Sequence, residues 1–212
     1  MKYLLFVALC IVFIPVYASD YENGLSALNR GDNTEALELF EKSCGLGEST
    51  GCIASGYMYS NGIGVIQNYT TAKGFFESAC AKGSMDGCSD LAHLYYNGYG
   101  VEHDYKLAYK LYRLACSKES LSGCHVLANQ YADGFGVEKN WSEAVKLYTK
   151  VCDSRKIESA CYDLGLMYYQ GEGILGKGSN PSKAEQLVKR ACRSKVPQAC
   201  QLQHAFELRR KD

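Results

Sequence analysis

Ten of the eleven cysteines in this 212-residue sequence fall into five close pairs, and their thiols are its most reactive groups. Cysteine thiols form disulfides, bind metal ions or exchange electrons, and their spacing helps to distinguish these uses. The second cysteine of a pair follows the first by eight positions, or by nine in the fourth pair. The pairs are Cys44/Cys52, Cys80/Cys88, Cys116/Cys124, Cys152/Cys161 and Cys192/Cys200.

Metal and redox chemistry need shorter spacings than these pairs provide. A zinc site typically takes its ligands from paired Cys-x2-Cys segments, and redox catalysis uses Cys-x-x-Cys in a βαβ setting. Neither spacing occurs in the sequence, and the four histidines are scattered over separate units: His93, His103, His125 and His204. The sequence therefore predicts disulfides, no metal and no other cofactor.

The N-terminal residues explain why the chain carries so many thiols. A short positive start is followed by an apolar run from Leu4 to Val16, with residues suited to cleavage before Ser19. Two alternatives stay open: a transmembrane anchor, for which the run is short, and a lipid-modified Cys10. Removing residues 1–18 leaves ten cysteines, so we expect an exported protein, periplasmic or secreted, without a membrane anchor.

The cysteine pairs recur because the whole sequence repeats. The first cysteines of the first four pairs lie 36 positions apart, and that of the fifth pair follows after 40. An aspartate or asparagine stands twelve positions before each first cysteine, and an alanine stands eight before. These residues are Asp32, Asn68, Asp104, Asn140 and Asn180, and Ala36, Ala72, Ala108, Ala144 and Ala184. A repeat of this length predicts a stack of similar structural units.

Each unit has the periodicity of two helices. Leu91, Ala92 and Tyr95 follow Cys88 at helical spacing, and equivalent residues follow the other second cysteines. A Gly-x-Gly turn ends this first helix, and the recurring Asp or Asn caps a second one. One helix pair is too small to bury its apolar face alone, so neighbouring pairs must stack. The sequence therefore predicts an all-α protein, an α/α solenoid of disulfide-stapled helix-turn-helix repeats.

We expect residues 1–18 to be a signal peptide and residues 19–212 to form a single repeat domain and a monomer. An N-terminal cap at about 21–43 begins the stack, and a C-terminal cap helix at about 192–212 ends it, because the Leu-Ala pattern is lost after Cys200. The repeat units are expected at about 44–79, 80–115, 116–151 and 152–191.

The helix pattern also bears on the cysteines. The first cysteine of each pair ends one helix and the second begins the next, so an antiparallel turn brings them within disulfide reach. Pairing inside each close pair is therefore the simplest connectivity. Each bridge closes a small loop and restrains the unfolded chain by about 2.5 kcal/mol on the loop-entropy model.

The pattern Leu-Ala-x-x-Tyr-x-x-Gly-x-Gly-Val, at Leu91–Val101 and Leu127–Val137, resembles the Sel1-like repeat, a relative of the tetratricopeptide repeat. With a cysteine pair in every unit and a signal peptide, the sequence is similar to the Helicobacter cysteine-rich protein family. The resemblance implies a secreted or periplasmic interaction scaffold. It also implies an alternative, because some members are described as penicillin-binding proteins or weak β-lactamases.

The motifs of serine β-lactam enzymes are missing. These enzymes use Ser-x-x-Lys, Ser-Asp-Asn and Lys-Thr-Gly, so that a lysine can activate the serine. The sequence contains no Ser-x-x-Lys; Ser89-Asp90 is followed by Leu91, and Lys177-Gly178-Ser179 only resembles the third motif. No catalytic residue is therefore predicted, and a β-lactamase activity would rest on the resemblance alone.

A variable face of the first helices is the candidate binding surface. Residues one, five and eight positions after each second cysteine share a helical face, and their types change from unit to unit. If that face lines the concave side, it suits a protein, peptide or peptidoglycan-like ligand; the alternative is a plain solvated surface. Lys plus Arg equals Asp plus Glu at 23 each, so no nucleic-acid partner is expected. The candidates are Tyr57, His93, Tyr96, His125, Asn129 and Tyr169.

Asn68 and Asn140 also stand in Asn-x-Ser/Thr sequons, and Glu138 precedes the second by two residues. Glycosylation at Asn140 is one interpretation. Helix capping alone accounts equally for both asparagines.

Overall fold

The computed structural model describes residues 19–171 and 179–209, so the expected signal peptide at 1–18 lies outside the described residues. Within those ranges the chain forms eleven α-helices and no strand, which confirms the all-α prediction. The helices are α1 (Asp20–Arg30), α2 (Asn33–Gly45), α3 (Ser49–Asn61), α4 (Tyr69–Ala81), α5 (Met85–Asn97), α6 (Tyr105–Ser117), α7 (Leu121–Asp133), α8 (Trp141–Asp153), α9 (Ser159–Gln170), α10 (Pro181–Arg193) and α11 (Pro197–Arg209). No described helix is long and apolar enough to cross a bilayer.

The recurring Asp and Asn residues cap the second helix of each pair, as predicted. In each case Oδ1 accepts a hydrogen bond from the backbone N–H three residues later, which satisfies a donor that the helix itself leaves unpaired. The donor–acceptor distances are 3.2 Å at Asp32, 3.0 Å at Asn68, 2.9 Å at Asp104, 3.1 Å at Asn140 and 3.0 Å at Asn180.

The first glycine of each Gly-x-Gly turn ends a first helix in the left-handed region. Gly62, Gly98, Gly134 and Gly171 have φ values of 68°, 70°, 82° and 80°, a conformation that side chains with a Cβ disfavour. The chain then crosses to the cap of the second helix, so each pair forms an antiparallel hairpin. The hairpins are α1/α2, α3/α4, α5/α6, α7/α8 and α9/α10, and α11 packs on the last of them.

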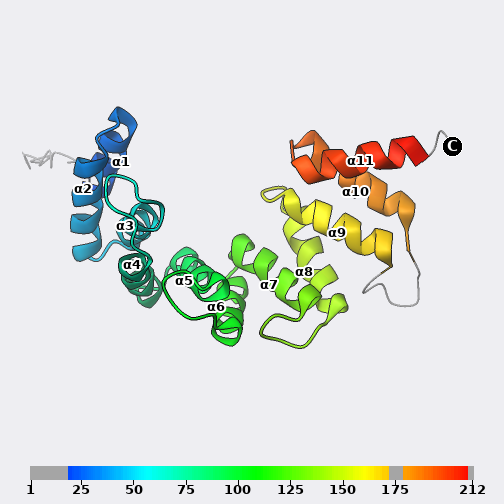
Figure 1. Cartoon of the computed structure of the whole chain (residues 1–212), viewed down its shortest axis with the longest axis horizontal. Helices are drawn as coiled ribbons and strands as arrows, with labels where there is room; N and C mark the ends of the chain where they lie inside the picture. The colour runs from blue at the N-terminus through cyan, green and yellow to red at the C-terminus, as the bar shows by residue number, and fades with distance from the viewer. Residues whose placement is uncertain (1–18, 172–178, 210–212) are drawn as a thin grey trace, which may run out of the picture.

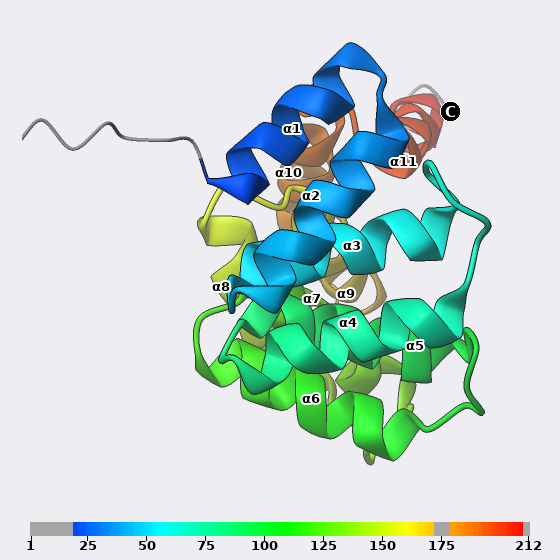
Figure 2. The same cartoon turned by 90° about the vertical axis from the view of Figure 1, so that its left-hand side faces the viewer.

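The hairpins stack into an arc in which α1 and α11 lie on the same open side (Figure 1). The largest helix–helix contacts join helices that are adjacent in sequence. Smaller contacts skip one helix and join first helices: α3 with α5, α5 with α7, and α9 with α11. First helices therefore lie closer together than second helices and line the inner side of the arc. In Figure 2 the second helices α2, α4 and α6 run one below another on the outer side.

Four disulfides fasten consecutive hairpins together, and the fifth fastens the last hairpin to α11. Each joins the two cysteines of one close pair, with Cα atoms 4.5 to 4.8 Å apart. Cys44–Cys52 joins α2 to α3, and the remaining bridges join α4 to α5, α6 to α7, α8 to α9, and α10 to α11. The second cysteine is fully buried in four of the bridges, so these bonds belong to the core: Cys52, Cys88, Cys124 and Cys161.

One core position departs from the repeat. Met58, Leu94 and Met167 fill equivalent buried sites on α3, α5 and α9, whereas α7 places Gln130 there with no exposed surface. The Gln130 amide nitrogen lies 3.5 Å from the backbone oxygen of Tyr105. Its Oε1 has no hydrogen-bond partner among the described residues. A buried amide without a full set of partners lowers stability.

We therefore expect Gln130→Met to stabilise the fold by about 1 kcal/mol, because it restores the residue type of the equivalent sites and removes an unpaired acceptor. Urea unfolding of the variant and the parent measures the change. Met58→Gln is the reciprocal control and should be destabilising. A lower midpoint for Gln130→Met would show that Gln130 makes a stabilising interaction.

Candidate ligand-binding groove

Two adjoining pockets open between first helices on the inner side of the arc. The aromatic pocket, of about 270 Å³, lies between α3 and α5 over α4, and is lined by Tyr57, Ser60, Asn61, Tyr69, Phe76, Asp90, His93, Leu94 and Tyr99. The second, the α5–α7 pocket, of about 400 Å³, is lined by Asp86, Ser89, Asp90, His93, Tyr112, Ser122 and Val126. Because Asp90 and His93 line both, the pockets form one surface across the successive first helices α3, α5 and α7, which we call the inner groove.

The aromatic pocket exists because Ser60 is small. The equivalent residue in the next repeat is Tyr96, which stands eight positions after Cys88 as Ser60 does after Cys52. The Tyr96 ring packs edge-on against Tyr105 at 5.3 Å and against Phe135 at 6.0 Å between ring centroids. A serine hydroxymethyl group at the same place leaves that volume open.

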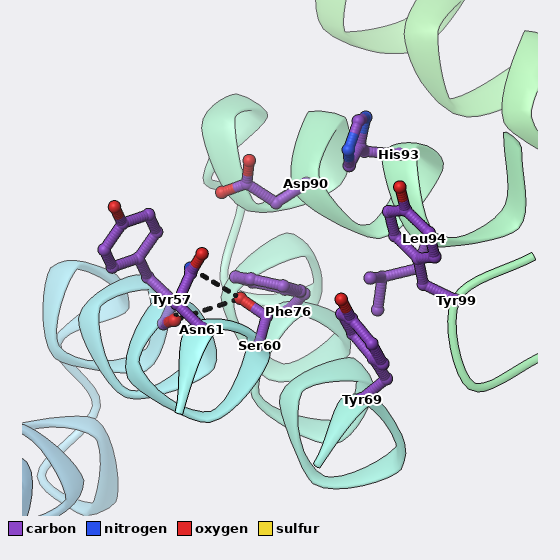
Figure 3. A pocket seen from close by; sticks show the side chains of 9 residues that line it. All are labelled: Tyr57, Ser60, Asn61, Tyr69, Phe76, Asp90, His93, Leu94 and Tyr99. Carbon is purple, nitrogen blue, oxygen red and sulfur yellow. Dashed lines mark hydrogen bonds between the residues drawn. The ribbon is translucent and has the colours of Figure 1, made fainter. Parts of the chain in front are cut away.

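One stacked aromatic pair forms a wall of the pocket, and an equivalent pair recurs one repeat later. Tyr69, the first residue of α4, stacks on Tyr99, the middle residue of the next Gly-x-Gly turn, at 5.0 Å. Tyr105 and Phe135 repeat this arrangement at 5.1 Å. Figure 3 shows the Tyr69 and Tyr99 rings on one side of the pocket and Tyr57 on the other, with Phe76 between them.

Asp90 contributes the carboxylate that both pockets share. It is partly buried on α5, and no hydrogen bond or ion pair within the described residues reaches its side chain. Burial, reinforced by the nearby Asp86 carboxylate, raises the pKa of Asp90 to about 6. Neither pocket is lined by a lysine or arginine that would oppose this shift.

His93 lies one helical turn beyond Asp90, and Figure 3 shows its ring apart from the Asp90 carboxylate. Its Nδ1 lies 3.1 Å from the Asn97 amide nitrogen, and its ring meets the Tyr99 ring edge-on at 5.8 Å. Burial lowers the pKa of His93 below its ordinary value, so the imidazole is neutral at pH 7. His93 therefore provides no positive charge to neutralise the Asp90 carboxylate.

The groove shows no nucleophile activated by a base among its lining residues. The Ser60 hydroxyl donates to the backbone oxygen of Tyr57 at 3.0 Å, and the Ser89 hydroxyl donates to that of Met85 at 2.9 Å. Ser122 pairs with the Ser120 hydroxyl at 3.0 Å. None of these three serines is hydrogen-bonded to a lysine or histidine, the arrangement that activates a serine. In the described part of the chain, no group of three or more His, Cys, Asp or Glu side chains is placed to hold a metal ion.

The structure brings two of the six sequence-predicted face residues, Tyr57 and His93, into the aromatic pocket. Tyr96 is engaged by the aromatic rings described above. His125 pairs with Asp163 across α7 and α9, with Nε2 and Oδ2 2.7 Å apart. The remaining two also have partners: Asn129 accepts a 2.7 Å hydrogen bond from Tyr148, and Tyr169 contacts Phe206 at 5.3 Å.

Sequence reasoning missed Asp90, Tyr69 and Tyr99. Asp90 stands two positions after Cys88, just outside the face that was selected by its variability. A signal was available for the two tyrosines, because aromatic residues recur at the start of the second helices and in the middle of the Gly-x-Gly turns. Their side-by-side placement depends on how far one repeat is rotated against the next.

Comparison with known proteins agrees with this architecture. The model of the Sel1 repeat matches residues 17–48, 49–84, 86–120, 121–154 and 158–196. Each segment contains one hairpin, so four disulfides lie between matched repeats, and Cys192–Cys200 joins the last matched segment to α11. This division also begins a repeat at the hairpin α1/α2, where the sequence pattern led us to expect a cap at about 21–43. No curated protein sequence matches the chain.

Several solved structures share the fold. A Sel1 repeat protein from Oxalobacter formigenes has a TM-score of 0.76 and 22% identity, covering 86% of this chain and 71% of that one. A protective antigen from uropathogenic Escherichia coli strains has a TM-score of 0.71 and 23% identity, covering 85% of this chain and 38% of that one. Cysteine-rich protein B of Helicobacter pylori is 30% identical over 66% of this chain and 94% of its own, with a TM-score of 0.47. With matching segments over most of its length, the chain belongs to the Sel1 repeat family.

Proposed function

We propose that this disulfide-rich Sel1 repeat protein is an exported scaffold that binds a peptide segment of a partner protein in the inner groove. The observation that carries the proposal is the pair of adjoining pockets that share Asp90 and His93. An extended peptide can place alternate side chains into neighbouring pockets while its backbone crosses between them. Serine hydroxyls and the Asn61 amide line the pockets and offer hydrogen-bonding groups to such a backbone.

The disulfides support the exported part of the proposal. Five bridges in one chain indicate folding in an oxidising compartment outside the cytosol, because cytosolic thiols are kept reduced. The apolar segment before Ser19 provides a route there. We infer a periplasmic or secreted location.

Filling the aromatic pocket should strongly weaken peptide binding without unfolding the protein. Ser60→Tyr introduces the residue that the next repeat carries as Tyr96. The new ring can pack against Tyr69 and Tyr99 as Tyr96 packs against Tyr105 and Phe135. Peptides selected from a displayed random library on the parent protein should bind Ser60→Tyr at least tenfold more weakly, measured by fluorescence anisotropy.

Ala132→Tyr is the matched control. Ala132 occupies the equivalent position on α7, outside both pockets, so the same change in side chain should leave affinity within about twofold. Circular dichroism establishes that both variants are folded. Selected peptides that bind Ser60→Tyr as tightly as the parent would place their site elsewhere and overturn the proposal.

A further inference from the structure

The inner groove carries a negative charge that the protein leaves without a counter-ion. The Asp90 carboxylate has no hydrogen-bond or ion-pair partner within the described residues, and Asp86 adds a second carboxylate to the same wall. A partly buried charge without a partner is unfavourable for the fold. The lining residues of both pockets include no lysine or arginine, so a bound ligand is left to provide the counter-ion.

The aromatic rings next to Asp90 are suited to the same kind of ligand. Tyr57 and Tyr99 are 57% and 41% exposed, so each presents ring surface that the protein does not cover. The face of an aromatic ring attracts a cation electrostatically, and the attraction grows when water is excluded. Tyrosine rings on opposite sides of the pocket with a carboxylate at its edge thus provide two independent attractions for a positive group.

The size of the pocket limits what that positive group can be. At about 270 Å³ the aromatic pocket lies just below the usual range for drug-sized ligands, so it suits one side chain and not a folded element. A lysine or arginine side chain has an apolar stem that can lie against Phe76 and Leu94 while its charged end reaches the carboxylate. Both apolar residues line the pocket.

Resting on the proposed function above, we propose that the aromatic pocket binds a lysine or arginine side chain of the peptide, with Asp90 as its counter-ion and the tyrosine rings against its stem and charge. The α5–α7 pocket then receives a neighbouring residue of the same peptide. This defines the ligand as a peptide with one essential basic side chain.

Parallel selections from one displayed random library test this assignment. Peptides retained by the parent protein should be enriched in lysine or arginine at one position, and selection on Asp90→Asn should lose that enrichment. In the best peptide, replacing the basic residue by norleucine should weaken binding to the parent at least tenfold, whereas binding to Asp90→Asn should change less than threefold. Asparagine is nearly isosteric, and Asp90 has no partner to lose, so the variant should fold.

Each alternative outcome has a definite meaning. Peptides that Ser60→Tyr excludes but that show no basic preference would overturn the cation assignment and keep the groove as a peptide site. A basic preference retained by Asp90→Asn would overturn the role of Asp90. Peptides unaffected by Ser60→Tyr would overturn the proposed function as well. Binding of free lysine amide as tightly as the peptide would point to a small amine as the ligand and also overturn the assignment.

The affinity of the basic peptide should depend on pH. Because the pKa of Asp90 is raised to about 6, its carboxylate is charged at pH 7.5 and largely protonated at pH 5, so affinity should fall between these values. The titratable groups that line the two pockets around it are Asp86 and His93 of α5, Tyr57 of α3, Tyr69 of α4, Tyr112 of α6 and Tyr99 of the following turn. Protonation of His93 at low pH repels a cation and acts in the same direction.

Asp90→Asn separates the two contributions. It should flatten most of the fall in affinity from pH 7.5 to pH 5, whereas His93→Gln should leave most of it. The reverse pattern would assign the pH dependence to His93 and contradict the counter-ion role of Asp90. Isothermal titration calorimetry of the same peptide at both pH values provides the measurement.

Discussion

Gly136→Ala should destabilise the protein by about 3 kcal/mol, although it adds one methyl group on a surface turn. Gly136 is the second glycine of its Gly-x-Gly turn and has φ +77°, a region that alanine disfavours. A Cβ at this position would also overlap the backbone carbonyl of Tyr105, which is the first residue of α6 in the preceding hairpin. Relief of that overlap requires two consecutive repeats to move apart.

Gly31→Ala is the control that isolates the overlap. Gly31 has φ +84°, yet a Cβ there would meet no atom within 4 Å. Its replacement should cost only the backbone term, about 1 kcal/mol. Thermal unfolding of both variants measures the difference. Equal losses at the two positions would show that the contact between the turn and the preceding repeat adjusts freely.

Removing the central disulfide should have an effect of similar size. Cys116→Ala/Cys124→Ala opens the bridge between α6 and α7, in the middle of the stack. The loop-entropy model gives a loss of about 2.5 kcal/mol, to which lost packing at the buried sulfurs adds. In a linear array each repeat is stabilised mainly by its neighbours, so weakening the middle interface should also separate unfolding into two transitions.

The terminal bridge provides the comparison. Cys192→Ala/Cys200→Ala frees only α11, which packs at the end of the stack. The main unfolding transition should stay within about 1 kcal/mol of the parent, with early loss of the last helix. Hydrogen exchange monitored by mass spectrometry would locate that loss. A single, equally large shift for both double variants would contradict a linear array of locally coupled repeats.

The fold could be predicted from the sequence because its determinants are local and are repeated. The cap at Asn140 needs only a side-chain oxygen three residues before a free N–H, and the turn at Gly134 needs only a positive φ. The boundary between repeats is harder to predict from the sequence. A periodic pattern has no intrinsic starting point, so the cysteine pairs could be placed within units as readily as between them.

The groove was harder to predict because it depends on differences between repeats. Ser60 matters only in relation to Tyr96, whose ring fills the equivalent space one repeat later. Asp90 is partly buried only because first helices on either side approach α5. Variability alone points to Tyr57 and His93, and it points equally to His125, whose ring is hydrogen-bonded to Asp163.

The position of the disulfides determines how the protein responds to a protease. Each bridge spans a tight turn between hairpins, so a cut inside that turn, for example between Cys116 and Cys124, leaves both fragments covalently joined. A cut in a Gly-x-Gly turn, such as the one after α5, lies outside every bridge and yields two separable pieces. Half of the connections are thus tolerant of nicking, and the integrity of the chain depends on the other half.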